Sequence, residues 1–158
     1  MAAIAFFEWC ESTAIGTAIR QSVWYFPVIE GFHLVALAML GGAALLVDLR
    51  LLGALFPRVP TAQLARDARP WLLGSIAAML ATGLLLFLSE AVKCFYSTAF
   101  WIKMAALLLS LVFLFAVKQP VAMRDAATTS PTICKTVGAI SLALWFTVAA
   151  AGRWIGFS

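Results

Sequence analysis

Residues 26–47 read FPVIEGFHLVALAMLGGAALLV, a run in which only Glu30 and His33 can carry a charge. An α-helix rises about 1.5 Å per residue, so about 20 mainly apolar residues cross a hydrocarbon core of ~30 Å. A lone strand would leave its backbone groups without partners in lipid, which excludes an extended structure here. The run therefore predicts a membrane-spanning helix, which we place at residues 24–52.

Three further stretches have the same character, at residues 71–92, 99–117 and 137–157. The chain of 158 residues is 64% apolar and 11% charged. Soluble globular domains are about half apolar and about a quarter charged, so the composition excludes a soluble protein. We expect an all-α fold, an integral membrane four-helix bundle that forms one transmembrane domain over residues 1–158.

The segments between the predicted spans are marked by proline. Pro57 and Pro60 close the first span, Pro70 opens the second, and Pro120 and Pro131 bracket the last loop. Between the first two spans, residues 61–69 are expected to form an interfacial helical turn. Residues 1–22 are too polar at their centre to span, and we expect an N-terminal interfacial helix that lies along the membrane surface.

The basic residues predict the orientation of the chain. Cytoplasmic connections of membrane proteins carry an excess of Lys and Arg. Here seven of the eleven basic residues lie in or beside the first and third connections, so both termini are expected to be periplasmic. The net charge of +4 then reflects topology and contact with anionic lipid headgroups, not a nucleic-acid surface. The seven residues are Arg50, Arg58, Arg66, Arg69, Lys118, Arg124 and Lys135.

Ionisable groups inside membrane spans are costly, which makes each of them a candidate site residue. With the predicted topology, five such groups fall in one layer near the outer face, whereas Asp48 and Arg50 at the other end are expected to anchor a loop. Met79, Gly83 and Glu90 share one face of the second span. The five groups of the outer layer are Glu30, His33, Glu90, Lys103 and Arg153.

His33 is the single histidine of the chain, and imidazole is a common ligand of haem iron and of transition metals. A b-type haem held by His33 would take its second axial ligand from a partner subunit or from Met39 or Met104. In this hypothesis Lys103, Arg153 and Trp101 contact the cofactor, and Glu30 or Glu90 acts on protons. The alternative is a set of structural ion pairs in which His33 only forms a hydrogen bond between helices. No cluster typical of zinc or copper sites, and no hydrolase or kinase constellation, is present.

Small residues and cysteines add two expectations. Seven small residues on the first two spans would let helices approach closely, which together with the single histidine predicts a homo-oligomer. Cys10 and Cys94 both fall on the outer side, where a disulfide can persist; the alternative is that they and Cys134 pack as small apolar residues. The small residues are Gly41, Gly42, Ala43, Ala44, Gly74, Ala78 and Gly83.

Several short motifs support a resemblance that covers nearly the whole chain from Ser12 onward. These are residues 26–34 (FPVIEGFHL), 47–53 (VDLRLLG), 81–84 (ATGL), 89–91 (SEA), 100–103 (FWIK) and 151–155 (AGRWI). They resemble an uncharacterised family of bacterial four-helix membrane proteins. A first-span His, a second-span Thr-Gly and a third-span Lys are also distantly similar to the membrane-embedded haem-binding protoporphyrinogen oxidases and the copper-resistance D type proteins. The resemblance to the oxidases implies cofactor binding by His33 and Lys103.

The leading hypothesis is a b-type haem protein of the bacterial inner membrane that carries electrons between the quinone pool and a periplasmic partner. A second hypothesis is a proton- or ion-coupled transporter or channel that uses the charged outer layer as a relay. A third is a non-catalytic subunit of a larger membrane complex, in which the same layer docks a partner. The sequence does not decide whether the chain is an enzyme.

Overall fold

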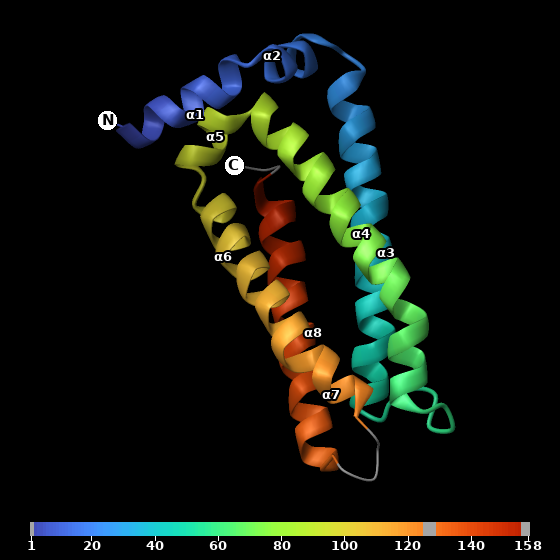
Figure 1. The fold of residues 1–158 in the computed structure, drawn as a ribbon. Coiled ribbons are helices and arrows are strands. Elements are labelled where there is room, and N and C mark those ends of the chain that lie inside the picture. The colour runs from blue at the N-terminus through green and yellow to red at the C-terminus, as the bar shows by residue number, and fades with distance from the viewer. Residues whose placement is uncertain (1, 125–128, 156–158) are drawn as a thin grey trace.

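The computed structural model describes residues 2–124 and 129–155, and it confirms an all-α fold with four helices that are long and apolar enough to cross a membrane. Helices α3 (Tyr25–Leu51) and α4 (Thr61–Ser89) form one antiparallel pair. The second pair is α6 (Thr98–Phe113) and α8 (Pro131–Ile155). Figure 1 shows the two pairs side by side, with the starts of α3, α6 and the end of α8 at one end of the bundle, which we call the upper end.

The described part of residues 1–22 forms two short helices instead of a span. Helices α1 (Ala2–Ser12) and α2 (Ala14–Gln21) lie across the upper end of the bundle (Figure 1). Glu11 ties them together, since one of its oxygens pairs with Arg20 at 2.7 Å. The other oxygen accepts the backbone N–H of Val92 at 2.8 Å, in the first turn of helix α5 (Ala91–Tyr96). The N-terminal segment is thus fastened to the connection between α4 and α6.

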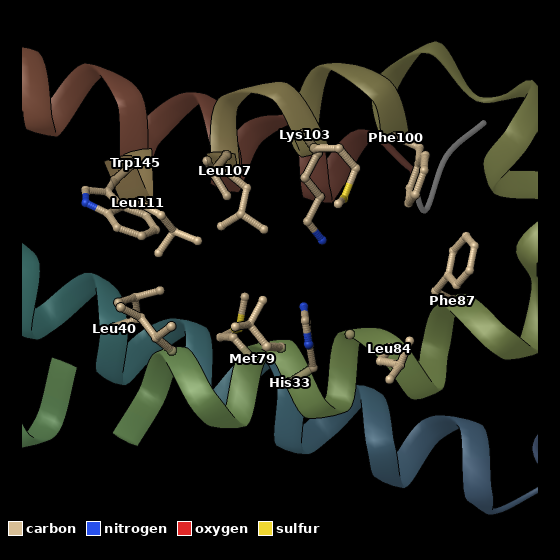
Figure 2. A pocket seen from close by; sticks show the side chains of 15 residues that line it. His33, Leu40, Met79, Leu84, Phe87, Phe100, Lys103, Leu107, Leu111 and Trp145 are labelled. Carbon is tan, nitrogen blue, oxygen red and sulfur yellow. The ribbon is translucent and has the colours of Figure 1, made fainter. Parts of the chain in front are cut away.

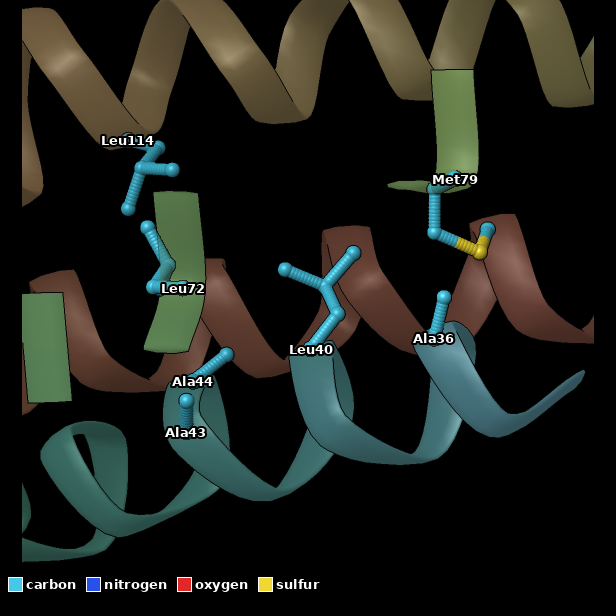
Figure 3. Close-up of a cluster of buried hydrophobic side chains, with 7 residues drawn as sticks. All are labelled: Ala36, Leu40, Ala43, Ala44, Leu72, Met79 and Leu114. Carbon is cyan, nitrogen blue, oxygen red and sulfur yellow. The ribbon is translucent and has the colours of Figure 1, made fainter. Parts of the chain in front are cut away.

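The core follows the helical repeat of α3 and α4. On α4 the buried positions Ala65, Ala68, Leu72, Ser75 and Met79 are spaced alternately three and four residues apart, which keeps them on one face of a helix. Leu72 and Met79 meet the buried face of α3 and Leu114, which follows α6, as Figure 3 shows. The cluster in Figure 3 consists of Ala36, Leu40, Ala43, Ala44, Leu72, Met79 and Leu114.

The predicted start of the second span is wrong. Pro70 does not open a helix but lies inside α4, which begins at Thr61, so residues 61–69 are the first turns of this helix. Ala65 and Ala68 pack with Val47 and Ala122 in a second buried cluster, which holds this part of α4 in place. Pro70 itself is exposed and removes a single backbone donor, so the packing outweighs the local break.

The predicted end of the third span is also wrong, because Pro120 does not terminate the helix. A π-helical turn (η1, Leu114–Lys118) connects α6 to α7 (Gln119–Met123), and the helical run continues to Met123. The buried residues of this run recur every four positions, whereas an α-helix repeats every 3.6, so such a stripe drifts by about 40° per step. The extra residue of a π-turn corrects this drift. The stripe consists of Ala106, Ser110, Leu114, Lys118 and Ala122.

The π-turn brings Lys118 into a buried ion pair with Asp48. Lys118 Nζ lies 2.7 Å from Asp48 Oδ1, and both side chains are almost completely buried, with 3% and 0% exposure. The ammonium group also donates to the Ala44 carbonyl and to Ser141 Oγ, each at 3.2 Å, and Ser141 Oγ donates to Asp48 Oδ2 at 2.9 Å. The pair therefore joins α3, the π-turn and α8.

This ion pair corrects two expectations. Asp48 does not anchor a loop, although Arg50 does, through bonds from its guanidinium to the Val59 and Pro57 carbonyls at 2.7 and 3.4 Å. Lys118 is buried and paired with Asp48, so it does not count toward the predicted excess of basic residues beside the connections. Six basic residues remain on the side predicted to be cytoplasmic.

Candidate functional site

A cavity of about 320 Å³ lies between the two helix pairs, in their upper half. Figure 2 shows His33 on one wall and Lys103 on the opposite wall, with their side chains pointing toward each other. Among the lining residues that the structure describes, these two carry the ionisable groups, and most of the others are apolar or aromatic. Apolar pockets with a few converging polar groups are typical ligand sites, and this volume is near the lower end of their range.

The cavity opens sideways, between α4 and α6. These two helices do not pack along each other, whereas α3 packs against α4 and α8, and α8 packs against α6. Leu80 and Leu84 of α4 and Met104 of α6 line the cavity and are also exposed on the outside of the bundle. Because this surface belongs to the apolar spans, the opening faces the lipid.

Aromatic side chains close the upper end of the cavity. Phe87 of α4 and Phe100 of α6 stack with their centroids 5.7 Å apart and their rings 16° from parallel, and both line the cavity (Figure 2). Phe7 of α1 packs against Phe87 from above, with centroids 5.6 Å apart. The N-terminal helices thus cover the end of the cavity nearest the membrane surface.

The imidazole of His33 is held by the second span. Its Nδ1 lies 2.8 Å from Thr82 Oγ1 on α4, and the Thr82 hydroxyl donates to the Ala78 carbonyl at 2.6 Å. A Cβ added to Gly83 would come within 3.3 Å of His33 Cε1, so the glycine gives the ring the room it needs beside α4. Of the seven small residues named above, Gly83 is the one that leaves room for His33.

Lys103 has no carboxylate partner among the residues that the structure describes. Its side chain runs beside Gly152 of α8, where an added Cβ would lie 3.4 Å from Nζ. The ammonium group is half-buried in an apolar cavity at membrane depth, where an unpaired cation is costly. An anionic or carbonyl oxygen of a ligand would compensate this cost.

The structure does not bring the remaining predicted site residues into the cavity. Glu30 is exposed on α3, and Glu90 lies 4.0 Å from Lys93 in a half-exposed pair beyond the end of α4. Trp101 donates to the Phe95 carbonyl at 3.1 Å outside the cavity, and Arg153 is exposed near the end of α8. Of the face shared by Met79, Gly83 and Glu90, the first two line the cavity.

Several residues of the cavity are not predicted as site residues by the sequence. Thr82 contacts the histidine, while Trp145 and the stacked rings of Phe87 and Phe100 bound the cavity. The Thr-Gly pair belongs to a motif of the sequence, but its contact with His33 depends on how α3 and α4 are rotated against each other. Trp145 lies inside the bundle and lines the cavity, although tryptophans of membrane spans are typical of the span ends.

The structure also tests the expectations for the cysteines and the small residues. Cys10 and Cys94 are free thiols in buried positions, so the packing alternative describes them and the disulfide does not. Gly41, Gly42 and Gly74 face open space within the chain, whereas Ala43 and Ala44 belong to the core. In residues 2–124 and 129–155 there is no group of three or more His, Cys, Asp or Glu side chains that could hold a metal ion.

Comparison with models of known protein families identifies the family of the chain. Residues 6–158 match the model of DUF6644, a family of unknown function. The chain belongs to the DUF6644 family. Neither the curated proteins nor the solved structures gave a match to this DUF6644 chain. Its likeness to the protoporphyrinogen oxidases and the copper-resistance D type proteins therefore rests on the short motifs alone.

Proposed function

We propose that this DUF6644 protein binds a b-type haem in the lateral cavity and carries electrons between the quinone pool and a periplasmic partner. The observation that supports the proposal is the position of the single histidine. Its Nδ1 is occupied by Thr82, and its ring faces a cavity with Lys103 opposite, a lysine that has no carboxylate partner among the described residues. Haem-ligating histidines commonly bond their second ring nitrogen to the protein in this way.

The side chains of the cavity fit such a group. His33 Nε2 would ligate the iron, and a haem needs no cluster of protein ligands because the porphyrin itself supplies most of the ligands of the iron. Lys103 would bind a propionate, and the sideways opening would admit a hydrophobic ring from the bilayer. A bound haem would supply reversible one-electron transfer, while the protein would supply ligation, burial and charge. Met79 and Met104 line the cavity and would be the candidates within the chain for a second ligand of the iron, whereas Met39 does not line it.

The proposal gives Glu30 and Glu90 no part in the cavity. In a homo-oligomer a partner copy would supply a histidine as second ligand of the iron. The protein would lie in the inner membrane with both termini in the periplasm. An ion relay through the outer layer receives no support from the placement of Glu30 and Glu90, which lie apart from His33 and Lys103.

A second candidate ligand is a quinone without haem. A single-ring head group would lie between His33 and Lys103, and the opening between α4 and α6 suits a long apolar tail. In this case Lys103 would donate to a carbonyl oxygen, and His33 would accept a hydrogen bond from a hydroxyl of the reduced or half-reduced head group.

The test is an absorption spectrum of the full chain purified in detergent from cells supplied with haem, oxidised and then reduced with dithionite. Under the haem proposal the parent shows a Soret band that sharpens on reduction, His33→Ala loses it, and Thr147→Val on the outer surface of α8 keeps it. A colourless parent would refute haem binding. Extraction of a stoichiometric quinone from that colourless protein, and its absence from Lys103→Met, would support the second candidate.

A further inference from the structure

The contact between Thr82 and His33 fixes more than the position of the ring. A threonine hydroxyl has one proton, and Thr82 Oγ1 lies 2.6 Å from the Ala78 carbonyl oxygen. Two oxygen atoms this close repel each other unless a hydrogen lies between them, so the proton of Thr82 is directed at Ala78. Oγ1 is then left with lone pairs, with which it can only accept.

The 2.8 Å contact between Thr82 Oγ1 and His33 Nδ1 must therefore be donated by the histidine. A neutral imidazole carries one N–H, so a proton on Nδ1 leaves a bare lone pair on Nε2. Gly83 lets the ring approach α4 closely enough for this bond, because a Cβ there would crowd Cε1 at 3.3 Å.

We propose that Thr82 is a positioning residue that keeps His33 protonated on Nδ1, so that the cavity offers a lone pair on its α3 wall and an N–H donor on its α6 wall. The donor is Lys103, which points toward His33 from the opposite side (Figure 2). The ligand must then present an electron acceptor to His33, either a metal ion or a hydroxyl proton. Toward Lys103 it must present an anionic or carbonyl oxygen.

This polarity deepens the proposed function, since it concerns the same cavity. It selects a ligand with two unlike ends: haem with its iron and propionate fits, and a half-reduced or reduced quinone with one hydroxyl and one oxygen acceptor fits as well. A fully oxidised quinone fits less well, because its two carbonyl groups both accept hydrogen bonds and the lone pair on His33 would repel one of them.

The single histidine makes the tautomer directly measurable. The full chain, labelled with ¹⁵N-histidine and purified in detergent without added haem, gives one pair of ring-nitrogen signals. At about pH 8 an ordinary imidazole is neutral, and the one-bond proton coupling identifies which nitrogen carries the proton. We expect the coupling on Nδ1. A coupling on Nε2 in the parent protein would overturn the proposal, whether or not any variant folds.

Three variants separate positioning from packing. Thr82→Val removes the hydroxyl at nearly constant shape and should move the proton, wholly or partly, to Nε2, whereas Thr82→Ser should restore the parent tautomer. Thr147→Val is the matched control, because Thr147 makes the same bond to its own helix, 2.8 Å to the Ala143 carbonyl, far from His33 in the sequence and outside the cavity lining. An unchanged tautomer in a folded Thr82→Val protein would contradict the role of Thr82.

Titration with haemin links the tautomer to binding. Loss of a side chain that orients a metal ligand commonly weakens binding about 10–100-fold, and we expect Thr82→Val to bind haemin at least about tenfold more weakly than Thr82→Ser or Thr147→Val. If the parent protein shows the proton on Nδ1 but takes up no haemin, the haem proposal fails and the tautomer assignment stands. The two proposals can therefore be refuted separately.

Discussion

The buried ion pair of Asp48 and Lys118 makes a quantitative prediction about stability. In Lys118→Met the carboxylate of Asp48, which is 0% exposed, keeps its bond from Ser141 but loses its counter-charge. Removal of one partner of a buried pair costs about 3–5 kcal/mol, because an uncompensated charge remains inside the protein. We expect the free energy of unfolding to fall by about that amount.

The double variant Asp48→Leu with Lys118→Met distinguishes this cause from lost packing. Replacement of both charges by apolar groups of similar size is often neutral or stabilising by about 1–4 kcal/mol. Ser141 can then donate to a carbonyl of its own helix. The double variant should therefore be markedly more stable than Lys118→Met alone.

Unfolding by SDS in mixed detergent micelles, followed by circular dichroism, measures these differences. Glu90→Gln is the control, since the pair of Glu90 and Lys93 has a 4.0 Å separation and each side chain is almost half exposed. Exposed pairs contribute below about 1 kcal/mol. A loss of less than about 1 kcal/mol in Lys118→Met would refute the argument. So would a double variant as unstable as the sum of its single changes.

Other positions give independent tests. Gly16→Ala should destabilise the packing of α2 on α4, because the new Cβ would clash with the Leu88 carbonyl oxygen. In contrast, the new Cβ of Gly42→Ala meets open space, so this variant should stabilise α3 by about 0.5–1 kcal/mol. The same SDS titration compares the two variants, and equal effects would contradict the close approach of α2 to α4. Burial, and then the negative charge of Glu90, raise the pKa of the Cys94 thiol from 9.0 to about 11. Cys94 should therefore react with iodoacetamide far more slowly near pH 8 than the half-buried Cys134, with a rate that still rises above pH 9, and similar rates for both thiols would be the contrary result. Since the folded protein holds this proton more tightly than the unfolded chain does, the Cys94 contribution to stability is present below pH 9 and is lost as the pH rises through about 11.

The four spans could be predicted from the sequence because hydrophobicity and length are local properties of a segment. The ends of the spans are predicted less accurately, because proline by itself indicates the end of a helix. Pro70 lies inside α4 because Ala65 and Ala68 pack against residues distant in the sequence, and Pro120 follows a π-turn within one continuous helical run. In both cases tertiary packing outweighs the loss of one backbone donor.

The candidate site shows the same division. Intramembrane charge alone singled out His33 and Lys103, which the structure places on facing walls of one cavity. The same rule also singled out Glu30 and Glu90, because depth along a span says nothing about which way a side chain faces around it. The sequence alone does not indicate the burial of Asp48, since its partner Lys118 lies 70 residues further along the chain on a π-turn that the sequence pattern does not predict.

The sequence by itself determined that the chain is a four-span helical membrane protein and which few residues carry charge within the spans. Those properties depend on the composition of a segment and on the cost of burying its charges, and both are local properties of that segment. The tertiary structure alone decided that Thr82 holds His33, that Lys103 faces it without a carboxylate partner among the described residues, and that the cavity between them opens to lipid. These contacts depend on the rotation and pairing of whole helices, which are set by packing between distant residues.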